Sequence, residues 1–281
     1  MVTVRDLLAQ AQAELTGDEG RLEAELLLAH ALRRDRAWLI AHRDDAVAPA
    51  LAGQLRCHVS RRAAGEPFAH IVGHRGFHAL DLVVTADVLI PRPETELLVE
   101  LALQRIPQDE KVEIADLGTG SGAVALAIAH ARPHSRVLAT DASAAALDVA
   151  RGNAQRLRIG NVEFAHGDWC AALGQRRFDL IVSNPPYIAE NDAHLAQGDL
   201  RFEPRSALAS GADGLDAIRV IVRDAPAHLH AAGWLLLEHG FDQGGAVRGM
   251  LGQREFAQVF TARDLEGRER VSGACLSGAR A

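Results

Sequence analysis

Apolar residues recur at every third or fourth position in residues 1–65, which is the spacing of one face of an amphipathic helix. Thr3 is placed to cap a first helix that carries Leu7 and Ala11, and Pro49 is placed to begin a later one. The pattern predicts a small helical bundle, with helices that start after Thr3 and that span Gly20 to Arg33, Ala37 to His42, and Pro49 to about Ala64.

Between residues 66 and 90 the pattern changes to short alternations bounded by glycines. Leu80, Leu82 and Val84 occupy every second position, which is the spacing of a half-buried strand. We therefore predict a β-hairpin linker here. A proline-containing segment then leads into a helix that reaches Arg105.

From Lys111 onward, short apolar runs alternate with helical patterns. Strands are expected at Val112–Leu117, Arg136–Thr140, Val162–His166, Phe178–Ser183, Trp234–Glu238, Phe256–Thr261 and Val271–Leu276. Helices are expected at Ala123–Ala131, Ala144–Leu157, Gly214–Ala231 and Gln243–Leu251. This alternation predicts an α/β doubly wound fold with its ligand crevice at the carboxyl ends of the strands.

Composition narrows the class of protein. Hydrophobic residues make up 48% and charged residues 24% of the 281 positions, as is usual for a globular protein. A net charge of -7 and a pI of about 6.0 disfavour a main role in gripping duplex nucleic acid. The mean hydropathy of -0.02, with no long apolar run and no signal sequence, predicts no membrane span and a cytoplasmic location.

We expect neither a metal site nor a disulfide. The three cysteines are far apart and form no C-x-x-C pair, which fits a reducing compartment. They are Cys57, Cys170 and Cys275. His70, His74 and His78 recur every four residues, a spacing that suits metal ligands on a helix, but the surrounding pattern indicates strands and turns.

A glycine loop follows the first predicted strand of the α/β part. Gly118, Gly120 and Gly122 allow the backbone to turn tightly and to approach a ligand without a Cβ in the way. Their spacing is G-x-G-x-G, and not the G-x-G-x-x-G of dinucleotide sites. Asp141 ends the second strand, where a carboxylate can hold ribose hydroxyls.

Asp168 and Trp169 close the third strand, beside the expected nucleoside pocket. The Asp168 carboxylate is placed either to accept from an adenine amine or to cap the next helix, and the two roles stay open. For Trp169 we favour a ring that covers the base.

Val182-Ser-Asn-Pro-Pro-Tyr-Ile188 ends the fourth strand. Proline has no N–H, so this turn offers carbonyl acceptors and few donors. The Asn184 side-chain oxygen and the Pro185 carbonyl can each accept one hydrogen of a planar N–H₂ group, and Tyr187 can pack against that group.

These motifs resemble class I S-adenosylmethionine-dependent methyltransferases, and within them the HemK/PrmC family of protein-(glutamine) methyltransferases. The resemblance covers essentially the whole chain. It rests on the glycine loop, Asp141 and the segments Gly65–Gly73, Leu89–Glu96, Asn184–Tyr187, Gln197–Pro204 and Leu236–Gly240.

The resemblance implies a Rossmann-like fold with a seven-stranded mixed sheet, and methyl transfer from S-adenosyl-L-methionine, without a metal, to the glutamine amide in the Gly-Gly-Gln motif of class I peptide-chain release factors. It assigns catalysis to Asn184 and Pro185, and substrate binding to the segment Asn184, Pro185, Pro186 and Tyr187. It assigns cofactor binding to Gly118, Thr119, Gly120, Ser121, Gly122, Asp141, Trp169 and Asn184.

Two other functions remain open on the motifs alone. An adenine or guanine amine is also a planar N–H₂ group, so a nucleic-acid methyltransferase could share the turn, although the acidic balance disfavours stable nucleic-acid binding. A non-catalytic module that only binds the cofactor would have no use for the acceptor turn.

The chain is expected to divide into residues 1–65, which recognise the release factor, residues 66–90, which link, and residues 91–281, which form the methyltransferase domain. A tripeptide offers little surface, whereas a standard protein interface buries roughly 1,600 Å², so the first part is the expected second contact surface. Its arginines form two clusters that either face an acidic partner patch or lie on a solvated helix face. They are Arg33, Arg34 and Arg36, and Arg56, Arg61 and Arg62.

Overall fold

The computed structural model describes residues 2–17 and 19–278. The chain divides into two compact units, residues 1–74 and residues 75–281. Each has a hydrophobic core of its own.

The first unit is the predicted helical bundle. Its helices are α1 (Val4–Glu14), α2 (Gly20–Leu32), α3 (Arg36–Ala41) and α4 (Pro49–Ala63). The cap predicted at Thr3 is confirmed, because Thr3 and Asp6 form a reciprocal capping box at the start of α1. Leu7, Leu27 and Leu55 are buried together between these helices.

A short helix, α5 (Phe68–Val72), lies where the sequence pattern indicated strands and turns. That expectation was wrong for His70, which sits within the helix. Pro67 precedes the first turn, and Gly73 ends the helix in the left-handed conformation with φ 80°. Ile71 packs into the core of the bundle, which is why the first unit extends past residue 65.

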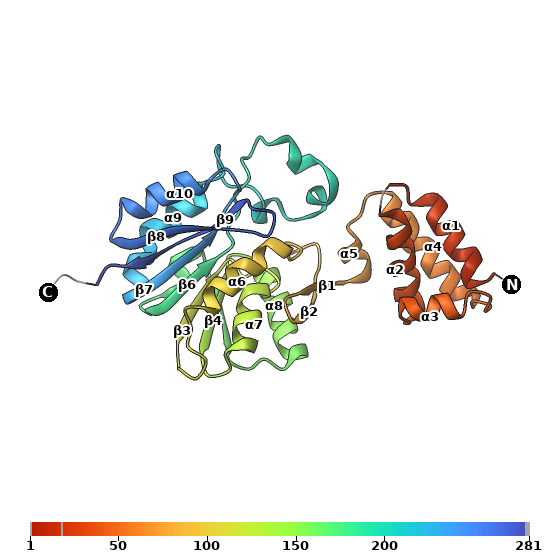
Figure 1. The fold of residues 1–281 in the computed structure, drawn as a ribbon, viewed down its shortest axis with the longest axis horizontal. Coiled ribbons are helices and arrows are strands. Elements are labelled where there is room, and N and C mark those ends of the chain that lie inside the picture. The colour runs from red at the N-terminus through yellow and green to blue at the C-terminus, as the bar shows by residue number, and fades with distance from the viewer. Residues whose placement is uncertain (1, 18, 279–281) are drawn as a thin grey trace. The chain divides into compact units, whose positions relative to one another are not determined.

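The predicted hairpin is confirmed in a shorter form. It consists of β1 (His74–Phe77) and β2 (Leu80–Val83), which form a two-stranded sheet (Figure 1).

The second unit is built on the expected seven-stranded mixed sheet. The strands are β3 (Glu113–Leu117), β4 (Arg136–Asp141), β5 (Val162–His166), β6 (Phe178–Ser183), β7 (Leu229–Glu238), β8 (Phe256–Arg263) and β9 (Glu269–Leu276). Their order is β5-β4-β3-β6-β7-β9-β8, and β9 runs antiparallel to both of its neighbours. Because the order reverses direction beside β3, the carboxyl ends of β3 and β6 border the crevice.

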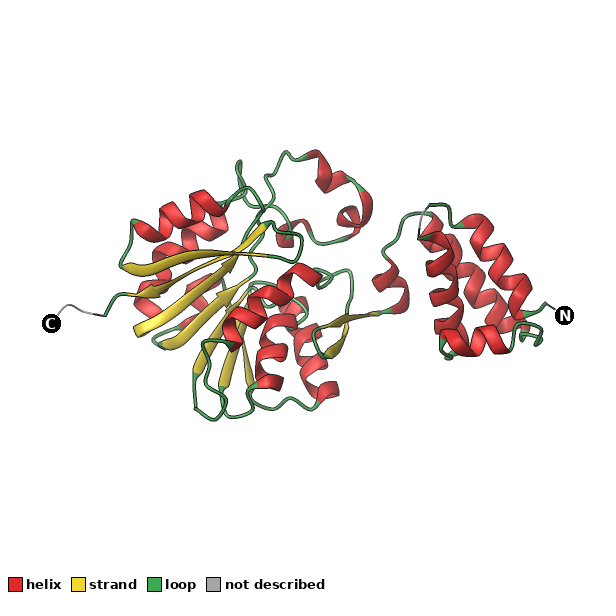
Figure 2. Cartoon of the chain, viewed as in Figure 1, coloured by secondary structure: helices red, strands yellow, loops and turns green. Residues whose placement is uncertain are grey.

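Helices cover both faces of this sheet (Figure 2). On one face lie α6 (Glu96–Leu103), α7 (Ala123–Ala131) and α8 (Ala144–Leu157). On the other lie α9 (Asp216–Asp224) and α10 (Gly244–Gly252). The central strands are apolar on both faces because each face is covered.

The helix predicted over Gly214–Ala231 is wrong at its carboxyl end. It stops at Asp224, and a short 3₁₀ turn, Ala225–His228, contains Pro226. Strand β7 then begins at Leu229, five residues earlier than the predicted Trp234, and passes through Ala232 with φ 63°. Proline cannot continue the helical ladder, which frees the following residues to pair with β6.

Three further 3₁₀ turns lie between β6 and α9, where the sequence pattern predicted no regular structure. They are Ala193–Ala196, Gly198–Phe202 and Arg205–Ala207. Across the described residues, the helices are all too short or too polar to cross a membrane.

Candidate active site

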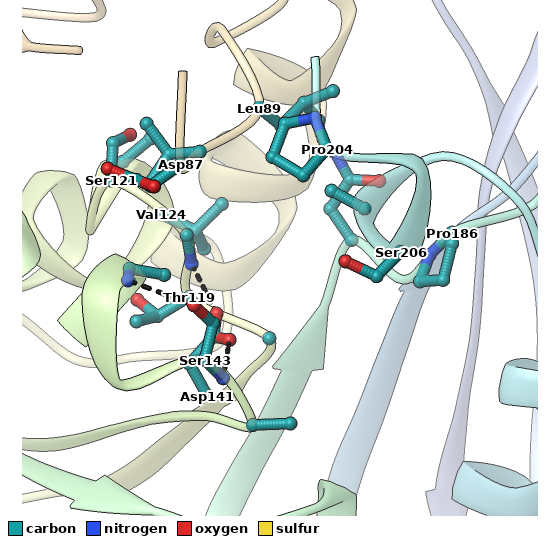
Figure 3. A pocket seen from close by; sticks show the side chains of 18 of the residues that line it. Asp87, Leu89, Thr119, Ser121, Val124, Asp141, Ser143, Pro186, Pro204 and Ser206 are labelled. Atoms are coloured by element: carbon teal, nitrogen blue, oxygen red, sulfur yellow. Dashed lines mark hydrogen bonds between the residues drawn. The ribbon is translucent and has the colours of Figure 1, made fainter. Parts of the chain in front are cut away.

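A cavity of about 460 Å³ lies at the carboxyl ends of β3, β4 and β6, a size in the usual range for small-molecule sites. Figure 3 shows two walls, one with Thr119, Asp141 and Ser143 and the other with Pro186, Pro204 and Ser206. The first wall follows β3 and β4. The second wall follows β6 and includes the 3₁₀ turn Arg205–Ala207.

The glycine loop is part of the first wall. Gly118 and Gly120 have φ values of 71° and 56°, a left-handed backbone that favours glycine. A Cβ on Gly118 would lie 3.2 Å from the Trp169 ring, so the absence of a side chain lets the indole lie directly over the backbone.

Gly122 has a different structural role from Gly118 and Gly120. It precedes α7 with φ 86°, and a Cβ there would lie 2.9 Å from Leu126 and 3.3 Å from Ala150. Gly122 is absent from the cavity lining, whereas Gly118, Thr119, Gly120 and Ser121 all line it. Gly122 therefore allows close packing of α7 against α8, and its assignment to the cofactor stays a prediction.

Asp141 holds the loop and faces the cavity. Its carboxylate accepts one hydrogen bond from the Gly120 N–H at 2.9 Å and one from the Ser143 N–H at 2.8 Å (Figure 3). Each carboxylate oxygen keeps a further lone pair, because an ionised carboxylate has about four acceptor positions. Asp141 can thus accept from a ligand hydroxyl while it fixes the loop.

Asp116, at the end of β3, is a buried acid for which the sequence pattern predicted no role. Burial raises the pKa of its carboxyl to about 7, although hydrogen bonds from the Thr119 hydroxyl and the Ala125 N–H lower the pKa. The donor–acceptor distances are 2.7 Å to Thr119 and 3.2 Å to Ala125. Asp116 therefore ties the glycine loop to the start of α7.

Asp168 and Trp169 both line the cavity. Asp168 stands at the N-cap position of the 3₁₀ helix Trp169–Leu173, but its carboxylate makes no capping hydrogen bond. Of the two roles left open for Asp168, side-chain capping is wrong, and the carboxylate remains available at the cavity. Trp169 has a strained φ of 41°, and a strained backbone is common where a side chain is held at a site.

The Asn184–Tyr187 turn leaves β6 at the second wall. The Asn184 Nδ2 donates to the Thr95 hydroxyl at 3.1 Å, so the side-chain oxygen of Asn184 stays available as an acceptor. Asn184 and Pro186 line the cavity, whereas Pro185 and Tyr187 are absent from its lining. The Tyr187 hydroxyl instead donates to Glu238 at 3.3 Å, and its carbonyl accepts from Gln243 at 2.9 Å.

Two segments that lie away from the strand ends also line the cavity, and neither had a predicted role. Leu89 and Arg92 come from the segment before α6, and Pro204 comes from the segment before α9. Fully buried Glu203 joins them: its carboxylate accepts from the Ile90 N–H at 2.9 Å and pairs with Arg92. The motifs at residues 89–96 and 197–204 were the sequence feature that could have identified these segments. The rule that ligands bind at the carboxyl ends of strands does not identify them.

Comparison with known proteins gives the family. The model of the Methyltransferase small domain matches residues 94–211, and that of the PrmC N-terminal domain matches residues 6–73. Among solved structures, a methyltransferase from Pyrococcus furiosus shares the fold with a TM-score of 0.54 at 17% identity, covering 78% of this chain and 97% of that one.

Curated proteins named release factor glutamine methyltransferase are similar over nearly their whole length. The protein from Xylella fastidiosa strain Temecula1 is 56% identical, over 91% of this chain and 93% of the relative. The Bordetella pertussis protein is 51% identical over 98% and 100%, and the Coxiella burnetii protein 47% identical over 96% and 98%. The chain therefore belongs to the release factor glutamine methyltransferase family.

Proposed function

We propose that this protein transfers a methyl group from S-adenosyl-L-methionine to the side-chain amide nitrogen of the glutamine in the Gly-Gly-Gln motif of class I peptide-chain release factors. One observation carries the proposal. Asn184, at the cavity wall, donates an N–H of its amide to the Thr95 hydroxyl, which leaves its side-chain oxygen as an acceptor for a substrate N–H.

The first wall fits the cofactor. The glycines keep side chains away from the loop backbone, the Asp141 carboxylate suits ribose hydroxyls, and Trp169 offers a flat apolar surface for an adenine ring. The Asp168 carboxylate, free of capping, suits the adenine amine. When bound, S-adenosyl-L-methionine supplies an electrophilic methyl carbon on a positively charged sulfur, which keeps the electron pair of the bond that breaks.

The second wall fits an amide. An amide nitrogen is a weak nucleophile because its lone pair is delocalised, so alignment and local electrostatics must supply the catalysis. In the proposal, the Asn184 oxygen and the Pro185 carbonyl each accept one N–H of the substrate glutamine, which aims its nitrogen into the cavity. That nitrogen gains the methyl group and releases one proton to water. Pro186 and Tyr187 complete the substrate-binding turn, with Tyr187 anchored on Glu238.

Residues 1–65 are proposed to recognise the release factor, with residues 66–90 as the linker and 91–281 as the methyltransferase domain. Three arginines already pair within the bundle: Arg36 with Glu25, Arg61 with Glu66 and Arg62 with Glu23. Arg33, Arg34 and Arg56 are exposed, which leaves them to face an acidic partner surface. We propose that the reaction takes place in the cytoplasm. Its partner is a protein, and no stable nucleic-acid complex is expected.

A substrate panel tests the proposal. The protein is incubated with cofactor carrying a labelled methyl group and, separately, with an intact release factor, the same factor with the motif glutamine replaced, DNA, and RNA. Label should enter only the intact factor. Equal labelling of the glutamine-replaced factor, or labelling of nucleic acid alone, would overturn it in favour of another target.

A further inference from the structure

The side-chain amide of Gln243 joins three loops at the carboxyl end of the sheet. Gln243 precedes α10, in the loop that follows β7. Its Nε2 donates to the Tyr187 carbonyl at 2.9 Å and to the Asp213 carbonyl at 3.3 Å. Its Oε1 accepts from the Gly240 N–H at 2.8 Å. One side chain thus holds the loop after β6, the loop before α9 and the loop after β7.

The partners of this amide fix its orientation. A backbone carbonyl only accepts and a backbone N–H only donates, so Nε2 must face the carbonyls of Tyr187 and Asp213, and Oε1 must face Gly240. The two hydrogens of Nε2 match the two carbonyls. A carboxylate of the same shape would place a second oxygen against both carbonyls. The position therefore fits a glutamine and does not fit a glutamate of the same size.

Gln243 does not cap the helix that it precedes. It stands at the N-cap position of α10, where Ser, Thr, Asp and Asn are favoured because their short side chains reach the helix N–H groups. The Gln243 side chain makes no capping hydrogen bond. Its backbone N–H donates to the Gly240 carbonyl at 3.0 Å, so its main chain and side chain both bind the same residue. The start of α10 does not explain the direction of this side chain, whereas the Tyr187 carbonyl does.

The loop before α9 approaches this hydrogen bond closely because it contains a glycine. Gly214 has a φ of 77°, in the left-handed region. A Cβ on Gly214 would collide with the Tyr187 carbonyl and would lie 2.8 Å from Gln243 Nε2. The backbone of this loop therefore packs directly against the hydrogen bond between Gln243 and Tyr187, which leaves the Tyr187 carbonyl little room on that side.

Tyr187 is connected to the cavity by a stiff segment. Pro186 lines the cavity (Figure 3), and Asn184 lines it as well. Pro185 and Pro186 have fixed φ angles, and the residue before each proline is restricted to extended geometry. Few backbone angles are therefore free to absorb a shift of Tyr187. Such a shift moves the Pro185 carbonyl and Asn184 with it.

We propose that Gln243 is a positioning residue, which acts through the Tyr187 carbonyl to set where the acceptor turn Asn184–Tyr187 meets its substrate. The inference rests on the proposed function, because that function assigns the turn to the substrate amide. Gln243 is absent from the cavity lining, so its contribution is indirect. It holds the end of the turn opposite to the one where Asn184 donates to Thr95.

Two substitutions at Gln243 separate positioning from structure. Gln243→Glu keeps the size and the acceptor for the Gly240 N–H, but it removes the donor and turns an oxygen toward the Tyr187 carbonyl. Gln243→Met keeps a similar length and removes both hydrogen-bonding groups. Gln253→Glu is the matched control, because it makes the same chemical change at an exposed glutamine directly after α10.

Kinetics with an intact release factor give the first readout. At about pH 7.5 we expect Gln243→Glu and Gln243→Met each to lower kcat by about tenfold, with the cofactor Kd unchanged within about twofold. Gln253→Glu should stay within about twofold of the parent. A structural role would instead lower the unfolding temperature and leave the kcat of the folded fraction unchanged.

Lower pH should rescue one variant and not the other. The carboxyl introduced by Gln243→Glu can donate to the Tyr187 carbonyl once it is protonated, while its other oxygen accepts from Gly240. Two carbonyl oxygens beside it raise its pKa above the ordinary value of about 4.3. Between about pH 7.5 and about pH 5.5, the kcat of Gln243→Glu relative to the parent should therefore rise at least about threefold, and that of Gln243→Met should not. The nearby acids Asp213 and Asp242 are the same in both variants, so their titration affects both ratios alike.

The second readout does not depend on the reaction. Tyr187 is the one tyrosine in the chain, so labelling tyrosine with ¹³C at the carbonyl carbon gives a single NMR signal. A hydrogen bond to the carbonyl oxygen moves this signal downfield, because it withdraws electron density from the carbon. At the higher pH the signal should therefore move upfield in Gln243→Glu and Gln243→Met, and it should stay in place in Gln253→Glu.

Each outcome supports or refutes the positioning role. The role is refuted if Gln243→Glu folds and keeps the parent kcat, or if the Tyr187 signal does not move. A loss of kcat in Gln243→Glu that low pH does not relieve also refutes it, because the missing donor is then not the cause. If the parent labels a nucleic acid and not the release factor, the proposed function fails, and the same kinetic comparison with that substrate still decides the role of Gln243.

Discussion

Strands β3 and β6 are neighbours in the sheet, but the segments that follow them have opposite backbone chemistry. After β3, the glycine loop supplies N–H donors, such as that of Gly120, in a left-handed backbone. After β6, Pro185 and Pro186 have no N–H at all, and the turn offers oxygen acceptors. One strand end therefore suits a ligand rich in oxygen acceptors and hydroxyls, and the other suits a ligand that donates from nitrogen.

The two segments also anchor on different buried acids. Asp116 holds the glycine loop, and Glu238 holds the proline turn, and burial raises the pKa of each to about 7. If cofactor and substrate are divided between the two strand ends, changes at one end should alter cofactor affinity, and changes at the other should alter turnover.

The largest effect is expected at the β6 end. Asn184→Ala removes the acceptor oxygen and should lower kcat by roughly 10²-fold or more, as when another positioned polar group is lost. Steady-state kinetics at saturating substrate measure this. Asn191→Ala is the matched control, because Asn191 is exposed, and it should keep the parent rate. Near-normal turnover in Asn184→Ala would remove Asn184 from catalysis.

A smaller effect is expected at the β3 end. Asp141→Ala should weaken cofactor binding by about 10- to 100-fold, since a hydrogen bond to a charged group contributes about 1.5–3 kcal/mol. Calorimetric titration with S-adenosyl-L-methionine measures the affinity. Asp148→Ala, at an exposed position of α8, should bind as the parent does. An unchanged Kd in Asp141→Ala would contradict the assignment of this wall to the cofactor.

The stability of the fold should depend on pH through Glu238. Burial raises the pKa of this carboxyl from its ordinary value of 4.5 to about 7. This shift stabilises the fold most below about 4.5, and the stability is lost as pH rises through about 7.

Glu238→Gln checks this sign. It should remove part of the fall in the free energy of unfolding as pH rises through about 7. The groups that face Glu238 in the parent are Thr95, Tyr187, Arg270 and Glu94, and all four remain in the variant. A variant that keeps the parent dependence of unfolding free energy on pH would assign that titration to another group.

The smallest effect is expected outside the cavity, in the first unit. Arg33→Glu combined with Arg56→Glu should raise KM for the intact release factor by about two- to fivefold and leave a short Gly-Gly-Gln peptide unaffected, because rim charges contribute little each. Lys111→Glu makes a similar change at an exposed site before β3 and serves as the control. Equal effects on factor and peptide would argue against recognition by this surface.

The sequence predicted the parts of the site that depend on local patterns. The glycine loop, Asp141 and the proline turn each follow an apolar strand, and the doubly wound order brings those strand ends together. The helix α5 was missed because Pro67 and Gly73 bound a helix too short to show a helical period. The end of α9 was missed because Pro226 outweighed the apolar pattern that continues past it.

Two long-range contacts at the site could not be predicted from local sequence patterns. Asn184 and Thr95 are 89 positions apart, and Ile90 and Glu203 are 113 apart. The hydrophobic pattern around each of these residues does not indicate which distant residue it contacts. Three-dimensional packing alone shows that Thr95 supports Asn184 and that Glu203 joins the segments before α6 and α9 at the cavity.

The central claim is that the second wall presents a glutamine amide for methylation, and product mapping tests it most directly. An intact class I release factor is incubated with the protein and S-adenosyl-L-methionine, digested, and sequenced by tandem mass spectrometry. We predict the mass of one added methyl group on the glutamine of the Gly-Gly-Gln peptide, located on its side-chain nitrogen, and roughly 10²-fold less of this product with Asn184→Ala over the same short incubation. A methyl group on any other residue, or an unmodified glutamine alongside methylated nucleic acid, would contradict the account.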